Sequence, residues 1–288
     1  MNNSAVMDAV TCCQICGSDQ IRVAYEMNKF DLLKCSKCGH LFSFVKEKQE
    51  DYKGHYFFGD KKEYFEHPDE RLYSKLHRLI QKYHSAQKKI YRLLDVGTGV
   101  GALPKHFDQL GYDGYGIDIS EEAIRYGKEE LKTPNLTATP IESYYPDTKF
   151  DVVICNNVIE HVPDPVNLAK NIYRLLSDDG LFLCVTVDSK SPIFYLSEKL
   201  FQLSKGTFRG PLERVCDVHH LHHFNQSSLE YVLKVSGFET RSRFGWDLPL
   251  ESILLTPLQK IAVSAAYGVS AVINSHFLQG VVCVKRSS

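Results

Sequence analysis

A glycine-rich turn and two acids in this chain have the types and spacing that nucleotide chemistry requires. An apolar run that ends at Val96 leads into the turn 97–101, and a second apolar run ends at Asp118, 23 residues after Asp95. A strand, a glycine turn, a helix and a second strand that ends on an acid form a nucleotide-binding βαβ unit, in which the acid holds a ribose diol. We therefore expect a nucleoside to lie over this turn.

Asp95 decides which nucleoside the turn can hold. The turn also fits the dinucleotide pattern Gly97-x-Gly99-x-x-Ala102, but the Asp95 carboxylate would repel a pyrophosphate placed over it. A ligand without phosphates that carries an ammonium and a sulfonium would be attracted instead. S-adenosylmethionine (SAM) is such a ligand, and a nicotinamide dinucleotide is disfavoured.

Three motifs resemble those of class I SAM-dependent methyltransferases. Leu94–Gly101 resembles their first motif, Phe150–Pro165 their fourth strand and the helix after it, and Leu176–Leu183 the turn into their fifth strand. The motifs follow the expected order and spacing over residues 85–245. The resemblance implies an enzyme with a doubly wound, Rossmann-like α/β fold and a seven-stranded sheet, which transfers a methyl group from SAM.

The resemblance also implies which residues hold SAM. Asp95 would lie near its amino group, Asp118 would accept from both ribose hydroxyls, and Ile119 would pack on the adenine. We expect Ile141 to contact the adenine amine through the backbone, since the run 139–142 lacks the Gly-Asp pair of many relatives. The full set of expected cofactor-binding residues is Asp95, Gly97, Thr98, Gly99, Gly101, Asp118, Ile119, Ile141 and Asn156.

Two histidines are candidates for a general base. Methyl transfer from a sulfonium is an in-line displacement in which alignment supplies most of the rate, and a base helps when the acceptor is a hydroxyl or a carbon acid. His161 follows the expected fourth strand. His220 lies in the run 219–225, which resembles a stretch with a catalytic histidine in sugar C-methyltransferases. A purely structural role for either histidine, and a metal site from the four histidines of this run, are alternatives.

Cysteines crowd the first forty residues. Four of them form the pattern Cys13-x2-Cys16-x18-Cys35-x2-Cys38. Each Cys-x-x-Cys turn can aim two thiolates at one ion, and Gly17 and Gly39 permit the left-handed backbone that such a turn needs. Four thiolates leave no position for water, so we expect a structural zinc, with Cys12 and His40 as alternative ligands. A zinc ribbon before a methyltransferase domain resembles a bacterial group linked to polysaccharide or secondary-metabolite synthesis.

The sequence divides into three predicted parts. Residues 1–45 form the zinc ribbon, 46–84 a connector and a helix, and 85–288 the methyltransferase domain. Within the last part, residues 189–218 are aromatic, basic and loop-like, which suits a lid over the substrate; a surface excursion without a role is the alternative. Strands are expected over residues 20–25, 30–34, 90–96, 135–138, 150–155, 181–187, 238–244 and 280–284.

The composition is that of an ordinary globular protein. The chain has 288 residues, of which 43% are hydrophobic. Its net charge of −1 gives no excess of positive charge that would attract a nucleic acid. No secretory signal is evident, so a cytoplasmic enzyme with a metal site is favoured over a disulfide framework. Polar residues interrupt the most apolar segment, 253–273, so we expect one or two buried helices and no transmembrane segment; contact with a membrane surface is the alternative.

These observations predict a SAM-dependent methyltransferase that acts on a small molecule, with a sugar or metabolite hydroxyl as the acceptor. Phe194, Tyr195 and Phe208 in the expected lid could stack on such an acceptor. The alternatives are an RNA base methyltransferase with a ribbon that grips nucleic acid, and a non-catalytic SAM-fold binding protein. The sequence identifies neither the acceptor nor the atom that is methylated, and it leaves the oligomeric state open.

Overall fold

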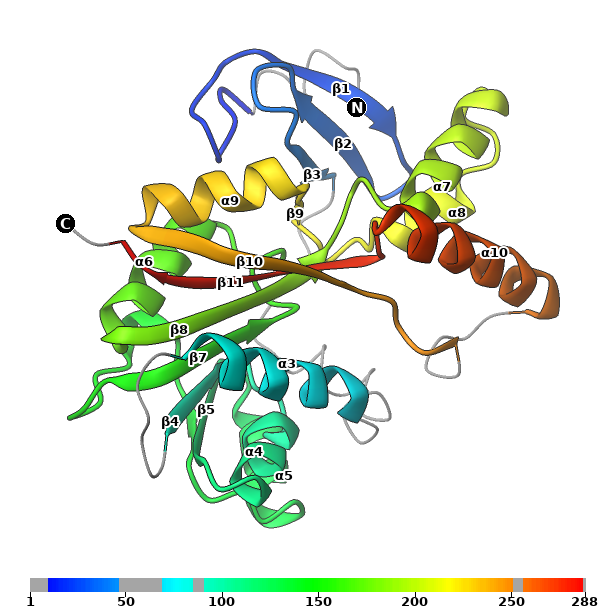
Figure 1. Ribbon diagram of the computed structural model, residues 1–288. Helices are drawn as coiled ribbons and strands as arrows, with labels where there is room; N and C mark the ends of the chain where they lie inside the picture. The colour runs from blue at the N-terminus through cyan, green and yellow to red at the C-terminus, as the bar shows by residue number, and fades with distance from the viewer. Residues whose placement is uncertain (1–9, 47–68, 85–90, 251–255, 287–288) are drawn as a thin grey trace.

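The computed structural model describes residues 10–46, 69–84, 91–250 and 256–286. A seven-stranded sheet lies at the centre with helices on both faces, and a smaller sheet built mainly from the N-terminal residues packs at one end (Figure 1). This is the doubly wound α/β fold that the sequence predicts. Most of the expected connector, residues 47–68, lies outside the described residues.

The large sheet has the order β10-β11-β8-β7-β4-β5-β6. Its central strands pair in parallel, and only β11 runs antiparallel to its neighbours. Parallel strands end at one edge, so β4, β5 and β7 bring Asp95, Asp118 and Asn156 to the same edge. The strands are β4 (Arg92–Val96), β5 (Asp113–Asp118), β6 (Leu136–Ala138), β7 (Phe150–Asn156), β8 (Leu176–Val187), β10 (Phe238–Trp246) and β11 (Leu278–Lys285).

The predicted strands are confirmed with small shifts at their ends, except that β8 begins earlier than expected. It begins at Leu176 and continues through Gly180, where the sequence suggested a turn. Its pairing with β7 changes register between Phe150 and Val152, which accommodates the extra residues of the longer strand.

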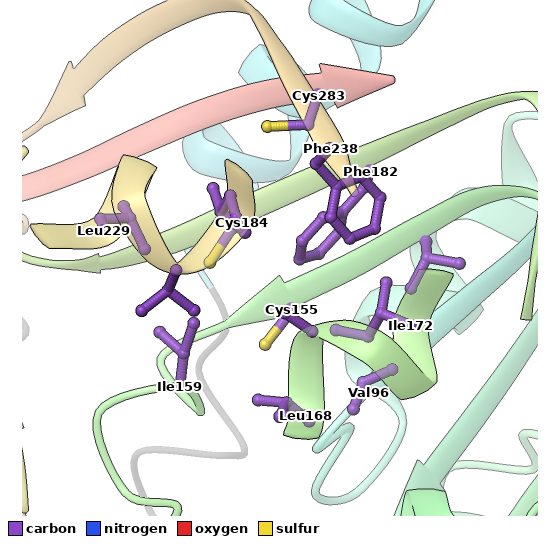
Figure 2. Packing of buried hydrophobic residues seen from close by; sticks show 14 of the residues in the cluster. Val96, Cys155, Ile159, Leu168, Ile172, Phe182, Cys184, Leu229, Phe238 and Cys283 are labelled. Atoms are coloured by element: carbon purple, nitrogen blue, oxygen red, sulfur yellow. The ribbon is translucent and has the colours of Figure 1, made fainter. Parts of the chain in front are cut away.

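Helices cover both faces of this sheet because successive strand residues point to opposite sides. Val152 and Ile154 of β7 pack with residues of α3 (Glu70–Tyr83) and α4 (Ala102–Gln109). On the opposite face, Cys155 packs with residues of α6 (Pro165–Leu175) and α9 (Gln226–Val235), as Figure 2 shows. Cys155, Cys184 and Cys283 are buried, as expected of inert core thiols. A further helix, α5 (Glu121–Glu129), lies beside β6.

The small sheet joins the N-terminal residues to a short segment that follows α8. Its strands are β1 (Ile21–Glu26), β2 (Phe30–Cys35), β3 (Leu41–Val45) and β9 (His222–His223), in that order. Leu41 and Phe42 pair antiparallel with His223 and His222. The sequence indicated β1 and β2 but gave no sign of β3 or β9, and the pairing makes the cysteine-rich unit continuous with the rest of the protein.

Residues 189–218 contain two helices, which corrects the expectation of a loop-like stretch. They form α7 (Pro192–Leu203), which begins after the N-cap Ser191 with proline in its first turn, and α8 (Gly210–Val215). Phe194 is buried in a cluster with residues of the small sheet, so it is not available to stack on an acceptor. Tyr195 and Phe208 are exposed.

The apolar segment near the C-terminus forms one helix, α10 (Pro257–Ile273), which packs against α7. The expectation that it is buried is wrong, because among the side chains that the structure describes in this helix only Val263, Ala266 and Ser270 are buried. Apolar side chains such as Val272 lie on the surface. Among the described residues, no helix has both the length and the apolar character needed to cross a membrane.

Asp69 attaches α3 to the rest of the fold through both carboxylate oxygens. One oxygen accepts from the Leu72 backbone N–H at 3.2 Å, and the other accepts from the indole N–H of Trp246 at 2.7 Å. Asp69→Ala removes a helix cap and a hydrogen bond, so we expect the free energy of unfolding to fall by about 1–3 kcal/mol in urea denaturation. Asp69→Asn keeps an acceptor and should lose less. Equal stability of the alanine variant and the wild type would contradict this role.

Candidate functional site

The glycine turn after β4 lies against the segment that follows β7. Gly97 has a left-handed φ of 74°, and a Cβ there would overlap a methyl group of Val158. The N–H groups of Gly97 and Thr98 both donate to the carbonyl of Ile117, at 2.8 and 3.0 Å, which anchors the turn on β5. A residue other than glycine at position 97 would therefore strain the backbone and push the two segments apart.

Asp118 is held by the backbone on both sides of the turn. Its two oxygens accept from the N–H groups of Gly99 and Ser120, each at 2.8 Å. A carboxylate has about four acceptor positions, so two remain for the hydroxyls of a ribose. Ile119 is half-exposed beside it, and its packing on the adenine stays a prediction. Ser120 caps α5, also as predicted.

Asp95 lies at the bottom of the same edge and is almost fully buried. Burial, together with the smaller effect of the nearby Asp118 carboxylate, raises the pKa of Asp95 to about 7 against the opposing hydrogen bond from Thr98. A phosphate near this pair would add a third negative charge in a low-dielectric site, whereas a cation would offset the two that are present. The electrostatics of the edge therefore fit the ammonium and sulfonium of SAM.

The ends of β6 and β7 supply the remaining expected SAM contacts. Ile141 begins a short 3₁₀ helix (Ile141–Ser143), and its carbonyl accepts from Arg174 at 3.1 Å. Asn156 ends β7, and Asn157 after it has a left-handed φ of 54°. The side-chain oxygens of both asparagines are buried without a hydrogen-bond partner in the described part of the chain. Buried polar atoms are normally paired, so a bound ligand would complete these two. Asn157 was not expected from the sequence.

The two candidate bases lie next to each other. The ring centroids of His161 and His220 are 4.8 Å apart, although the two residues belong to segments far apart in the sequence. The Nδ1 of His161 donates to the carbonyl of His219 at 2.9 Å, because a carbonyl can only accept. In the neutral form of this ring, the lone pair is therefore on Nε2.

Glu160 is a third member of this group that the sequence analysis missed. Its side chain is fully buried, and neither carboxylate oxygen has a hydrogen-bond partner among the described residues. Burial raises the pKa of Glu160 to about 7, although its own backbone N–H and the nearby Thr186 hydroxyl act to lower it. One donor atom from each of Glu160, His161 and His220 lies within 4.8 Å of the other two. The position of Glu160 directly before His161 was the available signal.

Residues next to and within the small sheet hold the backbone of Glu160 in place. The backbone carbonyl of Glu160 accepts from the N–H groups of Leu221 and His222, at 2.8 and 3.0 Å. The ring of His222 is in turn 3.1 Å from the ring of His40, nitrogen to nitrogen. Burial lowers the pKa of His222 to about 4 and that of His40 well below its usual range, so both rings are neutral at pH 7. The cysteine-rich unit is thereby connected to the backbone that carries Glu160.

The four predicted metal ligands converge on one point. The sulfur atoms of Cys13 and Cys38 are 3.7 Å apart and those of Cys16 and Cys35 are 3.6 Å apart, far beyond a disulfide bond. Zinc–sulfur bonds of about 2.3 Å at tetrahedral angles place thiolates about 3.8 Å apart, so the set fits a zinc ion. Gly17 and Gly39 have left-handed φ angles of 68° and 70°.

The thiol pKa values are consistent with a site that requires a cation. Burial raises the pKa of Cys13 to about 11 and also raises that of Cys38. At Cys35, burial raises the pKa, but backbone N–H groups and neighbouring thiols outweigh it and lower the pKa to about 7. Of the alternative ligands, Cys12 is exposed and His40 is engaged by His222; neither belongs to the convergent group.

Comparison with known proteins agrees with this geometry. A family model described as "Methyltransferase domain" matches residues 64–243, which leaves the cysteine-rich unit outside the match. The ubiquinone biosynthesis O-methyltransferase of Actinobacillus pleuropneumoniae serotype 7 is 29% identical over 46% of this chain and 70% of its own length. The protein of the same name from Psychrobacter cryohalolentis is 32% identical over 36% of this chain, but only 44% of that relative is covered.

A solved structure shares the fold. The SAM-dependent methyltransferase from Archaeoglobus fulgidus superposes with a TM-score of 0.53 over 80% of this chain and all of its own, at 18% identity. The family match covers more than half of this sequence, and the sheet order and glycine turn are those expected of the fold. The chain therefore belongs to the methyltransferase-domain family, and it is a class I SAM-dependent methyltransferase.

Proposed function

We propose that this enzyme transfers the methyl group of SAM to a hydroxyl oxygen of a small-molecule acceptor, such as a sugar or a phenolic metabolite. The proposal rests on two histidines, His161 and His220, whose rings lie next to each other. They lie near the glycine turn that is expected to hold SAM, because Val158, three residues before His161, packs against this turn at Gly97. The curated relatives named above are O-methyltransferases, which favours oxygen as the methylated atom.

Bound SAM supplies a methyl group on a sulfonium, which is open to in-line attack. The edge residues Asp95 and Asp118 hold and orient the cofactor, so that the acceptor approaches from the side of His161 and His220. As the acceptor oxygen bonds to the methyl carbon, the carbon–sulfur bond breaks with its electrons on sulfur, and the imidazole pair assists removal of the hydroxyl proton. The products are the methylated acceptor, S-adenosylhomocysteine and a proton that passes to solvent.

Charge and exposed residues favour a small acceptor over RNA. A net charge of −1 provides no long-range attraction for a polyanion. Tyr195 on α7 and Phe208 between α7 and α8 are exposed and offer stacking surfaces to an acceptor ring. The proposal that α7 and α8 act as a lid rests on these two side chains.

We further propose that Cys13, Cys16, Cys35 and Cys38 hold one structural zinc ion. The spacing of their sulfur atoms supports zinc, and four thiolates close the coordination shell. The role is structural because the unit they hold supplies β3, to which the strand after His220 is paired.

SAM binding should strengthen as the pH rises. Asp95 has a pKa near 7, and only its ionised form attracts the ammonium of SAM. Between pH 6 and pH 8 the ionised fraction increases about tenfold, so we expect the affinity measured by calorimetry to increase by up to about tenfold. Asp95→Asn should bind SAM more weakly and with a flatter pH profile. The same pH profile in both proteins would contradict the role of Asp95.

Purified protein should contain about one zinc ion per chain at the cysteine site. Cys35→Ser should lose this zinc in elemental analysis and lower the melting temperature, because folding of so small a unit is coupled to metal binding. Cys12→Ser is the matched control: it removes an exposed cysteine next to the site and should keep the zinc. An iron–sulfur chromophore, or equal loss in both variants, would refute the proposed site.

Replacement of the histidine that assists proton removal should slow turnover without releasing SAM. We expect His161→Ala or His220→Ala to reduce kcat by about 10²–10⁴-fold, measured as S-adenosylhomocysteine release with a panel of sugar and phenolic acceptors. His77→Ala, on α3, changes a histidine outside the group and serves as the control. Full turnover in both variants would exclude the proposed role, and methylation of RNA with steep salt dependence would exclude the small-molecule acceptor.

A further inference from the structure

The helix α10 carries apolar side chains on the side opposite to the one that packs on the protein. Val263, Ala266 and Ser270 are buried and recur at intervals of three and four residues, so they form the packed side. At 3.6 residues per turn, Ile261 and Val272 lie on the other side of the helix, where they are 68% and 85% exposed. A helix that is apolar around most of its circumference normally lies in a protein core or in lipid.

The neighbouring helix α7 adds to this apolar surface. The two helices pack against each other and lie side by side at the right of Figure 1. On α7, Leu196, Leu200 and Leu203 follow one another at intervals of four and three residues, so they share one side of the helix. All three are exposed, Leu203 to 82%. Apolar residues gathered in this way on the outside of a protein usually mark a surface that binds a partner.

The acidic residues of α7 and α8 are engaged by the cysteine-rich unit. The carboxylate of Glu198 accepts from the hydroxyl of Tyr25 on β1, and that of Glu213 accepts from the backbone N–H of Asn28 at 3.1 Å. The helix α10 contains no acidic residue. The two acids are therefore committed to the N-terminal hairpin and do not contribute negative charge to the outer face of α7 and α10.

The exposed charges beside the apolar surface are basic. Lys199 on α7, Lys205 directly after it and Lys260 on α10 are all exposed. A second copy of the chain that docked through the same face would bring these cations together with no acid between them, which opposes a symmetric dimer. An anionic lipid surface instead offers acyl chains to the apolar side chains and negative headgroups to the lysines.

We propose that the face formed by α7 and α10 binds the surface of an anionic lipid bilayer. The helix α10 lies in the plane of the headgroups, with Ile261 and Val272 inserted toward the acyl chains. The leucines of α7 enter the same layer, and the three lysines contact the headgroup phosphates. Each basic residue near an anionic leaflet strengthens binding about fivefold, so the lysines together contribute about a hundredfold.

Flotation of the purified full-length protein with lipid vesicles tests this surface without reference to activity. We expect the protein to float with vesicles of phosphatidylcholine and phosphatidylglycerol. With vesicles of phosphatidylcholine alone, or at high salt, binding should be at least tenfold weaker. Val272→Asp places a charge in the apolar face and should weaken binding at least tenfold. Val235→Asp, which changes an exposed valine on α9, is the matched control and should bind normally.

Charge reversal tests the basic residues separately. Lys260→Glu should weaken binding to the anionic vesicles about tenfold or more, whereas Lys170→Glu, an exposed lysine on α6, should leave it unchanged. Unchanged affinity for SAM in calorimetry establishes that each variant is folded and separates this test from that of the proposed function.

Two results would overturn the membrane surface. One is a wild-type protein that does not float with the anionic vesicles, and the other is a Val272→Asp variant that floats as well as the wild type. A dimer in light scattering that Val272→Asp dissociates, without flotation of the wild type, would assign the same face to a second copy of the chain and refute the lipid partner.

Discussion

The burial of negative charge at the carboxyl edge of the sheet is the constraint on which the site depends. Asp95, Asp118 and Glu160 lie at or near this edge, and Asp95 and Glu160 are almost inaccessible to water. Carboxylates in a low-dielectric interior require hydrogen bonds, protons or cations. Burial raises the pKa of all three carboxyl groups, to about 7 at Asp95 and Glu160, and backbone N–H groups partly offset this rise at Asp118. The edge is therefore organised for cationic ligands.

The linkage of these pKa shifts to stability has a definite sign. Both carboxyl groups bind protons more tightly in the folded protein than in the unfolded chain. Between the ordinary carboxyl range near pH 4 and the folded pKa values near 7, the ligand-free protein therefore loses stability as the pH rises. A cationic ligand beside Asp95 would offset this loss, because it stabilises the ionised carboxylate.

The cysteine-rich unit supports the same edge from outside the family match. Its strand β3 pairs with β9, and its His40 ring lies within hydrogen-bond distance of the His222 ring. Its apolar side chains also pack in one cluster with residues of α7 and α8. The segment that carries His220 is thus held by the unit rather than by the large sheet alone. A structural metal in the unit would act on the site through these contacts, without touching substrate.

The sequence predicted the elements whose chemistry is local. The glycine turn, the cap at Ser120 and the four cysteines depend on spacing within a few dozen residues, and each is found where expected. The β3–β9 pair was not predictable, because about 180 residues separate its two strands and β9 has only two residues.

The remaining differences between the expected and the observed structure concern which side chains are buried, and a single sequence does not show this. Periodicity shows that a helix has an apolar face but not what covers it. Phe194 is therefore buried against the small sheet, and α10 keeps apolar side chains on the surface, both contrary to expectation. Glu160 was overlooked for the same reason, since only its burial distinguishes it from an ordinary acidic residue in a loop.

Calorimetric titration with SAM and with NAD tests most directly whether this edge selects a cation without phosphates. Buried Asp95 beside Asp118 should attract the ammonium and sulfonium of SAM and repel a pyrophosphate. We expect SAM to bind at micromolar concentrations with one site per chain, and NAD to show no binding and no competition. Tight binding of NAD with none of SAM would contradict the electrostatic basis of the site.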